Sequence, residues 1–388
     1  MSPKNLIDPG DTSEPRPERK EHPMNNSPTP GNDAEKKPDG SAFAEFKAFF
    51  SRHLKRRICH RKTPVRGLSI SVMLTVLLIL VAGDYSHGAK KPSFQAWLAD
   101  VRKEALANGV SEETLNHALK DLRPIPLVVK RDRSQPEFKL TLDEYLKRVV
   151  TEKRIRKGRK KLREHRGLLT RISKKYGVEP EFIVTLWGIE THYGERTGSF
   201  PVLAAVATLA YDGRRSRYFR REFLNALKIL DDGHISAENM NGSWAGAMGQ
   251  VQFMPSSFQS YAVDYDGDGR IDIWNNVGDA LASAANYLAR SGWKEGQGWG
   301  QEIQLPEGFN EKLISSRIRK SLSEWQRMGI LAKGFPQNPN LQASIVQPDG
   351  EGGRAFLAYP NYRVILKWNR SNFFAVAVGT LADRIGAP

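Results

Sequence analysis

A glutamate inside an apolar run constrains the fold of this chain more than any other feature. The run is VTLWGIETHYG, Val184 to Gly194. A proline suits the first turn of a helix and a glycine its end, so Pro180 and Gly194 predict a helix over about residues 180–193. The fold must therefore bury a helix that carries an acidic side chain within its apolar sequence.

The glutamate, Glu190, lies on the apolar face of this predicted helix. Counting back by three, four and seven residues gives Trp187, Leu186 and Ile183, which share that face. A carboxyl group in such surroundings, near the negative end of a helix dipole, is expected to keep its proton toward neutral pH. A general acid needs that property. The structural alternative is a buried glutamate paired with Arg or Lys.

Length and composition allow a core of this size. The chain has 388 residues, of which 39% are hydrophobic, and such a length predicts about two to three subdomains. The net charge is +16, which indicates a polyanionic partner or surface.

A basic segment followed by an apolar one indicates export. Residues 1–66 predict a disordered, basic leader. Residues 67–89 contain an uncharged core of about 15 residues, typical of a signal peptide, and a retained membrane anchor is the alternative. We therefore expect a periplasmic protein whose only membrane contact is this segment. The single cysteine, Cys59, precedes the apolar core and predicts neither a disulfide framework nor a lipoprotein.

The sequence after this segment predicts an α+β protein that is mainly helical. FQAWLADVRKEALANGVSEETLNHALKDL predicts a helical hairpin, and long basic helices follow it, which together predict a helical domain at residues 90–176. SIVQP, AFLAY and YRVILKW predict short strands in a small β-containing subdomain at residues 301–365. Residues 366–388 predict a final helix, Phe373 to Ile385, that returns to the core.

The basic run KRIRKGRKKLREHRGLLTRI admits two interpretations. Lys and Arg at this density could neutralise phosphates, but no aromatic platform or nucleic-acid reader motif accompanies them. We interpret the run as amphipathic helix with a solvated cationic face, and expect no nucleic-acid partner. In an exported protein, such a face suits an anionic cell wall or membrane surface.

A second stretch, NGSWAGAMGQVQFMPSSFQSY at residues 241–261, suits a sugar. Its small residues allow a close approach to the backbone, and Ser243 and Gln252 supply a hydroxyl and an amide. Aromatic side chains that could stack on a sugar, or else belong to the core, are Trp187, Tyr193, Trp244, Phe253 and Tyr287.

Four stretches in order, GIETHYG, ATLAYDGRRSRYF, GSWAGAMGQVQFMPSSF and AANYLARSGW, resemble the motifs of the lytic murein transglycosylase B family. The resemblance covers about residues 94–385. It implies a lysozyme-like catalytic core at residues 177–300, with an added helical domain and a small β-containing insertion. It also implies an enzyme that cuts the β-1,4 bond between N-acetylmuramic acid and N-acetylglucosamine without water, leaving a 1,6-anhydro ring. Glu190 matches the single catalytic acid and base, and no catalytic cofactor is implied.

The resemblance also implies substrate-binding residues. Ser243 and Gln252 match substrate contacts beside the acid, and Tyr287 matches an aromatic of the cleft. We expect Phe253, one of the candidate stacking aromatics, to bind substrate as well. The alternative for each is a packing residue.

Two further groups match the family pattern. Arg214 and Arg215 match a basic pair near the sugar and peptide sites, and arginine suits the carboxylates of a stem peptide. Asn369 matches a cleft asparagine, but its neighbours Trp368 and Phe374 stand where the resemblance leads us to expect tyrosines. Simple surface charges are the alternative for the two arginines.

Other functions remain open at this point. A hydrolase of the muramidase type needs a second carboxylate roughly 5 to 9 Å from the first, and the nearest acid in sequence, Glu195, lies beyond the helix end. A non-catalytic peptidoglycan-binding protein and a calcium-responsive adaptor are further alternatives. We expect a monomer that binds peptidoglycan glycan strands.

DYDGDGRIDIWN, residues 264–275, follows the spacing of an EF-hand calcium loop. The predicted ligands are Asp264, Asp266, Asp268, the carbonyl of Arg270, Asp272 and Asn275. Asn275 replaces the bidentate glutamate of the last position, which removes a charge and an oxygen and favours a structural calcium ion over a signalling one. A metal-free Asp/Gly turn is the alternative.

Overall fold

The structure is a computed structural model that describes the following residues: 91–134, 140–332, 334 and 336–387. All of them belong to residues 40–388, one of the two units into which the chain divides. The other unit, the predicted leader and the predicted apolar segment lie outside the described residues. Within the described ranges, no helix has the length and apolarity needed to cross a membrane.

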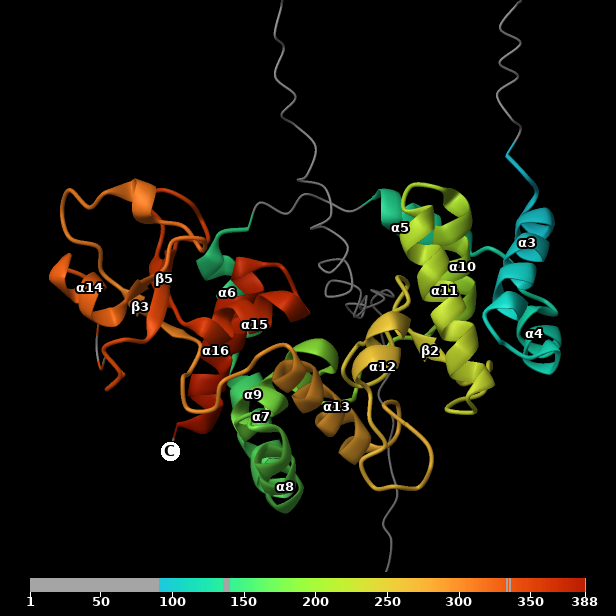
Figure 1. Cartoon of the computed structure of the whole chain (residues 1–388), viewed down its shortest axis with the longest axis horizontal. Helices are drawn as coiled ribbons and strands as arrows, with labels where there is room; N and C mark the ends of the chain where they lie inside the picture. The colour runs from blue at the N-terminus through green and yellow to red at the C-terminus, as the bar shows by residue number, and fades with distance from the viewer. Residues whose placement is uncertain (1–90, 135–139, 333, 335, 388) are drawn as a thin grey trace, which may run out of the picture. The chain divides into compact units, whose positions relative to one another are not determined.

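Among the described residues, six helices precede the glutamate helix, and they include the predicted hairpin (Figure 1). Ser111 caps the second arm of that hairpin, since its side chain accepts a hydrogen bond from the Thr114 amide. The helices are α3 (Phe94–Ala107), α4 (Glu112–Leu119), α5 (Pro126–Arg133), α6 (Leu142–Val149), α7 (Glu152–Glu164) and α8 (Arg166–Tyr176).

The glutamate helix, α9 (Pro180–Thr191), lies in the core. Residues 182–191 are all buried. The helix ends because His192, Tyr193 and Gly194 each adopt a positive φ, of 58°, 65° and 84°, which stops the right-handed helix two residues before the predicted end. Helices α7 and α16 (Asn372–Gly386) pack against α9 and against each other, as Figure 1 shows.

The segment between α9 and the β-containing region is also helical. Its helices are α10 (Val202–Asp212), α11 (Ser216–Asp231), α12 (Pro255–Tyr261) and α13 (Val277–Arg290). A two-stranded antiparallel sheet joins β1 (Phe200–Pro201) to β2 (Asn241–Gly242). This pairing holds the start of the Gly-rich stretch beside the segment that follows α9.

A four-stranded antiparallel sheet forms the β-containing region, with the strand order β3-β6-β5-β4. The strands predicted from SIVQP and AFLAY are confirmed as β5 and β6. Buried residues between 303 and 359 form a hydrophobic cluster separate from the main core. The elements are β3 (Gly300–Ile303), the 3-10 helix η3 (Glu311–Leu313), β4 (Lys320–Ser321), α14 (Leu322–Arg327), β5 (Gln342–Val346) and β6 (Ala355–Ala358).

The strand predicted from YRVILKW is wrong, because this segment is helical. It forms α15 (Pro360–Trp368), with Pro360 in the first turn. Tyr362, Ile365 and Trp368 are buried at intervals of three residues, the spacing of a helix face rather than of a strand. The fold is mainly helical with small antiparallel sheets, as predicted. The division into domains stays a prediction.

Candidate active site

Glu190 lies in the last turn of α9, and its side chain is almost enclosed. It is 9% exposed, and the indole Nε1 of Trp368 donates a hydrogen bond of 2.7 Å to its Oε1. Trp368 is the last residue of α15 and is itself 7% exposed. The acid and its indole donor are therefore fixed by two buried helices.

An aromatic cluster surrounds the indole. The Trp368 ring lies 4.8 Å from that of Tyr287 and 5.4 Å from that of Phe253, and Tyr287 contacts Tyr261 at 4.5 Å. The Tyr287 hydroxyl donates to the Lys367 carbonyl over 2.7 Å. Burial, and next the neighbouring Tyr261, raises the pKa of Tyr287 to about 12. The structure thus brings the two predicted cleft aromatics, Phe253 and Tyr287, to the residue that holds the acid.

Tyr145 is a site residue that sequence reasoning missed. It lies on α6, is 5% exposed, and its ring is 5.8 Å from that of Phe373. Burial raises the pKa of the Tyr145 phenol, and the Glu190 carboxylate raises it further, whereas Arg154 lowers it. The electrostatic influence of Glu190 marks Tyr145 as part of its surroundings. Its motif, TLDEYLKRV, carries no signal of this in the sequence.

Gln250 joins the Gly-rich stretch to α9, and sequence reasoning missed it as well. Its Oε1 accepts from Trp187 Nε1 over 2.9 Å, and its Nε2 donates to the Trp274 carbonyl over 3.1 Å. The hydroxyl of Thr191, next to Glu190, donates to the Gln250 carbonyl over 2.7 Å. These bonds fix the stretch against the helix end that carries the acid.

The side chains of Ser243 and Gln252 support the backbone of the same stretch. Ser243 Oγ accepts from the Ala247 amide over 3.0 Å. Gln252 Nε2 donates to the carbonyls of Thr197 and Gly249, each over 3.0 Å. Both side chains are buried, so their hydrogen bonds within the protein are structural.

The space beside the glycines of the stretch is occupied by other parts of the protein. This corrects the interpretation that they leave the backbone open to a sugar. A Cβ added to Gly242 would lie 2.2 Å from the Ala247 carbonyl oxygen, and one added to Gly249 would lie 2.6 Å from that of Ile273. Gly198 makes a similar approach, 2.2 Å from the Gly242 oxygen. These glycines allow backbone to pack on backbone.

Four of the candidate stacking aromatics belong to the core. Trp187, Trp244 and Phe253 are 2%, 1% and 2% exposed. Tyr193 is buried too, and its hydroxyl donates to the Arg154 carbonyl over 2.7 Å.

Arg214 and Arg215 share one buried partner. Both guanidinium groups form an ion pair with Oδ1 of Asp132 on α5, whose side chain is 2% exposed. Arg214 also donates to the Asp132 carbonyl over 2.8 Å. The pair therefore joins the start of α11 to the end of α5.

Asn369 follows Trp368 and precedes the last helix. It is 5% exposed, and its Oδ1 accepts from the Ser371 amide over 3.1 Å. Ser371 in turn caps α16 by accepting from the Phe374 amide. Asn369 thus holds the turn that orients Trp368.

The EF-hand-like loop gathers three of the predicted ligands. Carboxylate oxygens of Asp264, Asp266 and Asp268 lie within 4.8 Å of one another. This set of hard oxygen donors fits a calcium ion. Asp272 instead accepts from the Trp274 and Asn275 amides through Oδ1, and the Asn275 Nδ2 donates to its Oδ2 over 3.3 Å.

Asp279, which the sequence did not indicate, anchors both ends of the loop. It is fully buried and accepts from the Tyr265 amide over 2.8 Å and from the Asp272 amide over 2.7 Å. Burial raises the pKa of this carboxyl group.

A polar cavity of about 600 Å³ lies beside the loop. Thr197, whose carbonyl binds Gln252, is on its wall, so the cavity adjoins the Gly-rich stretch. Its side chains include Asn239, Asn241, Arg270 and Trp274.

Comparison with known proteins identifies the family to which this fold belongs. A family model described as the transglycosylase SLT domain matches residues 93–383. The chain belongs to this family.

Individual relatives agree with this assignment. The chain is 36% identical over 251 residues to membrane-bound lytic murein transglycosylase B of Escherichia coli strain K12, a match that covers 62% of this chain and 66% of that protein. It is similar to the crystal structure of SltB3 from Pseudomonas aeruginosa in complex with NAG-NAM-pentapeptide, with a TM-score of 0.74 and 45% identity over 76% of this chain and 80% of the other. It is also similar to the Escherichia coli lytic transglycosylase Slt35 in complex with calcium, with a TM-score of 0.65 and 30% identity over 78% and 94% of the two chains.

Proposed function

We propose that this chain is a peptidoglycan lytic transglycosylase with Glu190 as its single acid and base. The observation that carries the proposal is the nearly enclosed carboxyl group of Glu190, held by the Trp368 indole beside the aromatic cluster. The complex of the relative SltB3 with NAG-NAM-pentapeptide supports peptidoglycan as the substrate.

The Trp368 bond supports a mechanism in which one oxygen of Glu190 carries the proton. An indole N–H can only donate, so Oε1 accepts from it and Oε2 would carry the transferable proton. Glu190 protonates the glycosidic oxygen as its bond to C1 of N-acetylmuramic acid breaks. The resulting carboxylate takes the proton of the C6 hydroxyl, whose oxygen bonds to C1 and closes the 1,6-anhydro ring. One carboxyl group serves both steps and is regenerated, and no water is consumed.

The remaining predicted residues receive proposed roles. Tyr287, which is partly exposed, would pack against a sugar ring, and the buried Phe253 would support it from behind. Ser243, Gln252 and Asn369 would hold the backbone around the acid and contact the sugar. Arg214 and Arg215 are proposed to bind carboxylates of the stem peptide. They would do so with the N–H groups that are not used in their ion pairs with Asp132.

A structural calcium ion is proposed in the EF-hand-like loop. Asp264, Asp266 and Asp268 would hold it, with the Arg270 carbonyl, Asp272 and Asn275 completing the shell after local rearrangement. The convergence of three carboxylates and the calcium complex of the relative Slt35 support the site. The ion would fix the loop next to α13 and take no part in bond cleavage.

The proposed location is the periplasm, where peptidoglycan is found. The apolar segment at 67–89 would export the chain or anchor it, and the membrane-bound relative from Escherichia coli is compatible with either. We propose a monomer, because one chain supplies Glu190, Trp368 and the aromatic cluster.

The test is digestion of purified sacculi by the wild type, Glu190→Gln and Glu195→Gln. Glu195 is a matched control, since its side chain is 60% exposed and pairs with Lys157. We expect soluble anhydromuropeptides from the wild type and the control, and none from Glu190→Gln. Reducing-end products, heavier by one water in mass spectrometry, would show a hydrolase instead. Binding of sacculi without soluble product from the wild type would show a non-catalytic binding protein.

A further inference from the structure

The positive charge of the chain is concentrated on two helices. Residues 90–388 contain 45 basic and 33 acidic side chains, a net charge of +12. Residues 152–175, which span α7 and nearly all of α8, contain 12 basic and two acidic side chains, a net charge of +10. Most of the net charge of this region therefore lies on one pair of helices.

The exposed basic side chains of α7 form a stripe. Lys153, Arg156, Lys160 and Arg163 are all exposed, and their spacing of three, four and three residues places them on one face of the helix. Ten residues of helix rise make the stripe about 15 Å long. The opposite face is buried, because a Cβ added to Gly158 would lie 2.4 Å from Ile385 of α16.

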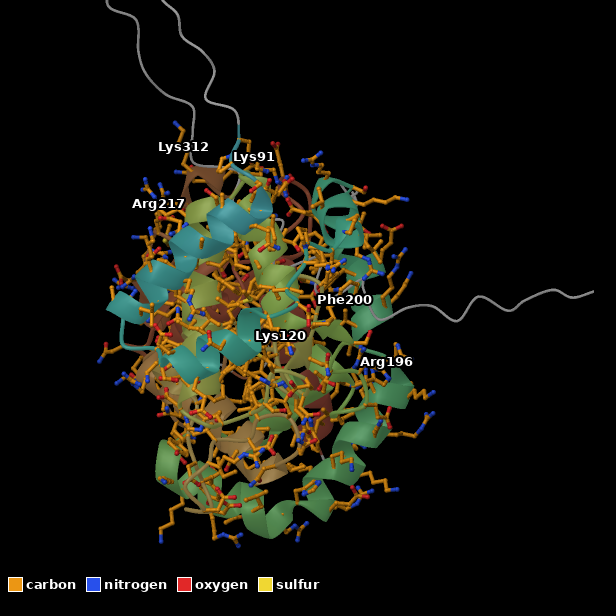
Figure 2. All side chains as sticks on the ribbon, turned by 90° about the vertical axis from the view of Figure 1, so that its right-hand side faces the viewer. Lys91, Lys120, Arg196, Phe200, Arg217 and Lys312 are labelled. Carbon is orange, nitrogen blue, oxygen red and sulfur yellow. The ribbon has the colours of Figure 1, made fainter. Side chains whose placement is uncertain are left out.

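Little of this charge is neutralised within the described residues. Three ion pairs join basic side chains of the two helices to carboxylates, from Lys157 to Glu195 and from Lys160 and Lys161 to Glu164. Side chains with no carboxylate of the described residues at ion-pair distance include Lys153, Arg156, Arg163, Arg166, Arg171, Lys174 and Lys175. Figure 2 shows nitrogen-tipped side chains projecting outward from the green helices. Like charges held this close repel one another. An anionic partner would reduce this electrostatic repulsion.

The same helix borders the catalytic one. Helix α7 packs against α9, and Lys157 Nζ donates to the carbonyl of His192, two residues after Glu190, over 3.1 Å. The basic face therefore starts next to the end of the helix that carries the acid.

We propose that the cationic face, defined as Lys153, Arg156, Lys160 and Arg163 of α7 with Arg171, Lys174 and Lys175 of α8, binds the carboxylates of peptidoglycan stem peptides. It would hold the polymer on the enzyme while the glycan strand is bound at Glu190. This inference rests on the proposed function, and it concerns retention of the polymer rather than bond cleavage.

Other anionic partners fit less well. A helix that lies in a membrane interface needs apolar side chains that face the lipid, and the exposed large hydrophobic residues of the described part, Leu127, Tyr218, Met328 and Leu331, are not on α7 or α8. Binding of single-stranded nucleic acid relies on exposed aromatic platforms. The one aromatic residue of α7 and α8, Tyr176 at the end of α8, is only partly exposed. Carboxylates spaced along a polymer need neither feature.

The test compares two quadruple variants in an inactive Glu190→Gln background. The first changes Lys153, Arg156, Lys160 and Arg163 to Gln. The control changes the exposed residues Lys312, Arg317, Arg319 and Arg327 of the β-containing region to Gln, which removes the same charge elsewhere. We expect the first to bind sacculi about 10- to 100-fold more weakly in a sedimentation assay, with a smaller dependence on salt, and the control to bind within about twofold of the parent.

Two further measurements identify the partner. Amidation of the sacculus carboxylates is expected to abolish the difference between the two variants. Equal binding of both variants to native sacculi, or a difference that survives amidation, overturns the proposal. Loss of binding to anionic phospholipid vesicles without loss of binding to sacculi overturns it in favour of a lipid surface.

Failure of the proposed function would look different. In the active background, both quadruple variants are expected to cleave short soluble glycan oligomers that lack peptides at the wild-type rate. No cleavage by the wild type would contradict the proposed activity, while the sedimentation assay would still report on the cationic face.

Discussion

Trp368 donates its indole hydrogen bond to Glu190 over 2.7 Å and across 178 residues of sequence. The family resemblance leads us to expect a tyrosine at this position, and the change to tryptophan therefore preserves a hydrogen-bond donor. An indole differs from a phenol in that it can donate a hydrogen bond but cannot accept one. The acid of this chain thus has a neighbour with a single, fixed role.

Removing that donor is expected to slow catalysis. Trp368→Phe keeps the ring in the aromatic cluster but leaves Oε1 of Glu190 without its indole partner. A hydrogen bond to a charged group contributes roughly 1.5 to 3 kcal/mol, so we expect kcat to fall about 10- to 100-fold. Release of soluble fragments from sacculi measures this.

Trp299→Phe is the matched control. The Trp299 indole donates to the Asp383 carboxylate over 2.9 Å, so the same type of bond is lost at a partly buried pair elsewhere in the protein. It is expected to lower the melting temperature and leave kcat within about twofold. Equal losses of kcat in the two variants would contradict a specific role for Trp368.

Glycine at position 198 is expected to be essential for the β1–β2 pairing. Gly198→Ala would place a Cβ 2.2 Å from the Gly242 oxygen and push β2, with the adjoining Ser243, away. Gly213→Ala is the control, because Gly213 has the same φ of 96° and no atom within 4 Å of an added Cβ.

The control should lose about 1 to 2 kcal/mol of unfolding free energy through its left-handed backbone alone. Gly198→Ala should lose at least about 2 kcal/mol more. Urea denaturation measures both values, and similar losses would show that the close backbone approach is unimportant.

Glu222 is expected to make stability fall as pH rises. It is 2% exposed, and its carboxylate accepts from the amide and hydroxyl of Ser256. Burial raises the pKa of Glu222, although the bonds from Ser256 lower it in part. Because the folded state favours the protonated form, its contribution to stability is complete below the ordinary pKa and is lost as pH rises through the raised value.

Glu222→Gln stays neutral, so its melting temperature is expected to rise relative to that of the wild type as the pH increases above the ordinary carboxyl pKa of about 4. Asp231→Asn is a control for which the pH dependence of stability is expected to have the opposite sign. Hydrogen bonds from Ser111 hold the pKa of Asp231 below its usual range, so its stabilisation is present above the ordinary pKa and is lost as pH falls. A melting-temperature difference for Glu222→Gln that does not vary with pH would contradict the argument.

Calcium is expected to stabilise the protein through the loop. Saturation at about 100 times the dissociation constant adds about 2.7 kcal/mol to the unfolding free energy, which scanning calorimetry detects as a higher melting temperature. Asp268→Asn removes one of the three converging carboxylates and should abolish most of this shift. Glu113→Gln, an exposed acid on α4, should keep it. An unchanged melting temperature of the wild type in calcium would contradict a metal site.

Much of the local structure follows from the sequence. The start of α9 at Pro180, the hairpin capped by Ser111 and the strands β5 and β6 all appear where local patterns predict them. The prediction for YRVILKW was wrong because a short run of β-branched and aromatic residues fits the periodicity of a helix as well as that of a strand. Packing against the rest of the protein favours the helix.

The sequence by itself determined that Glu190 lies on the apolar face of a helix, because helical periodicity and end signals act over a few residues. The tertiary structure decided what meets that face: Trp368 from the C-terminal helices, Tyr145 from the N-terminal ones and Gln250 beneath the helix end. It also decided that the glycines of residues 241–261 pack against the protein's own backbone. Such contacts depend on how distant helices pack, and local residue patterns carry no information about that packing.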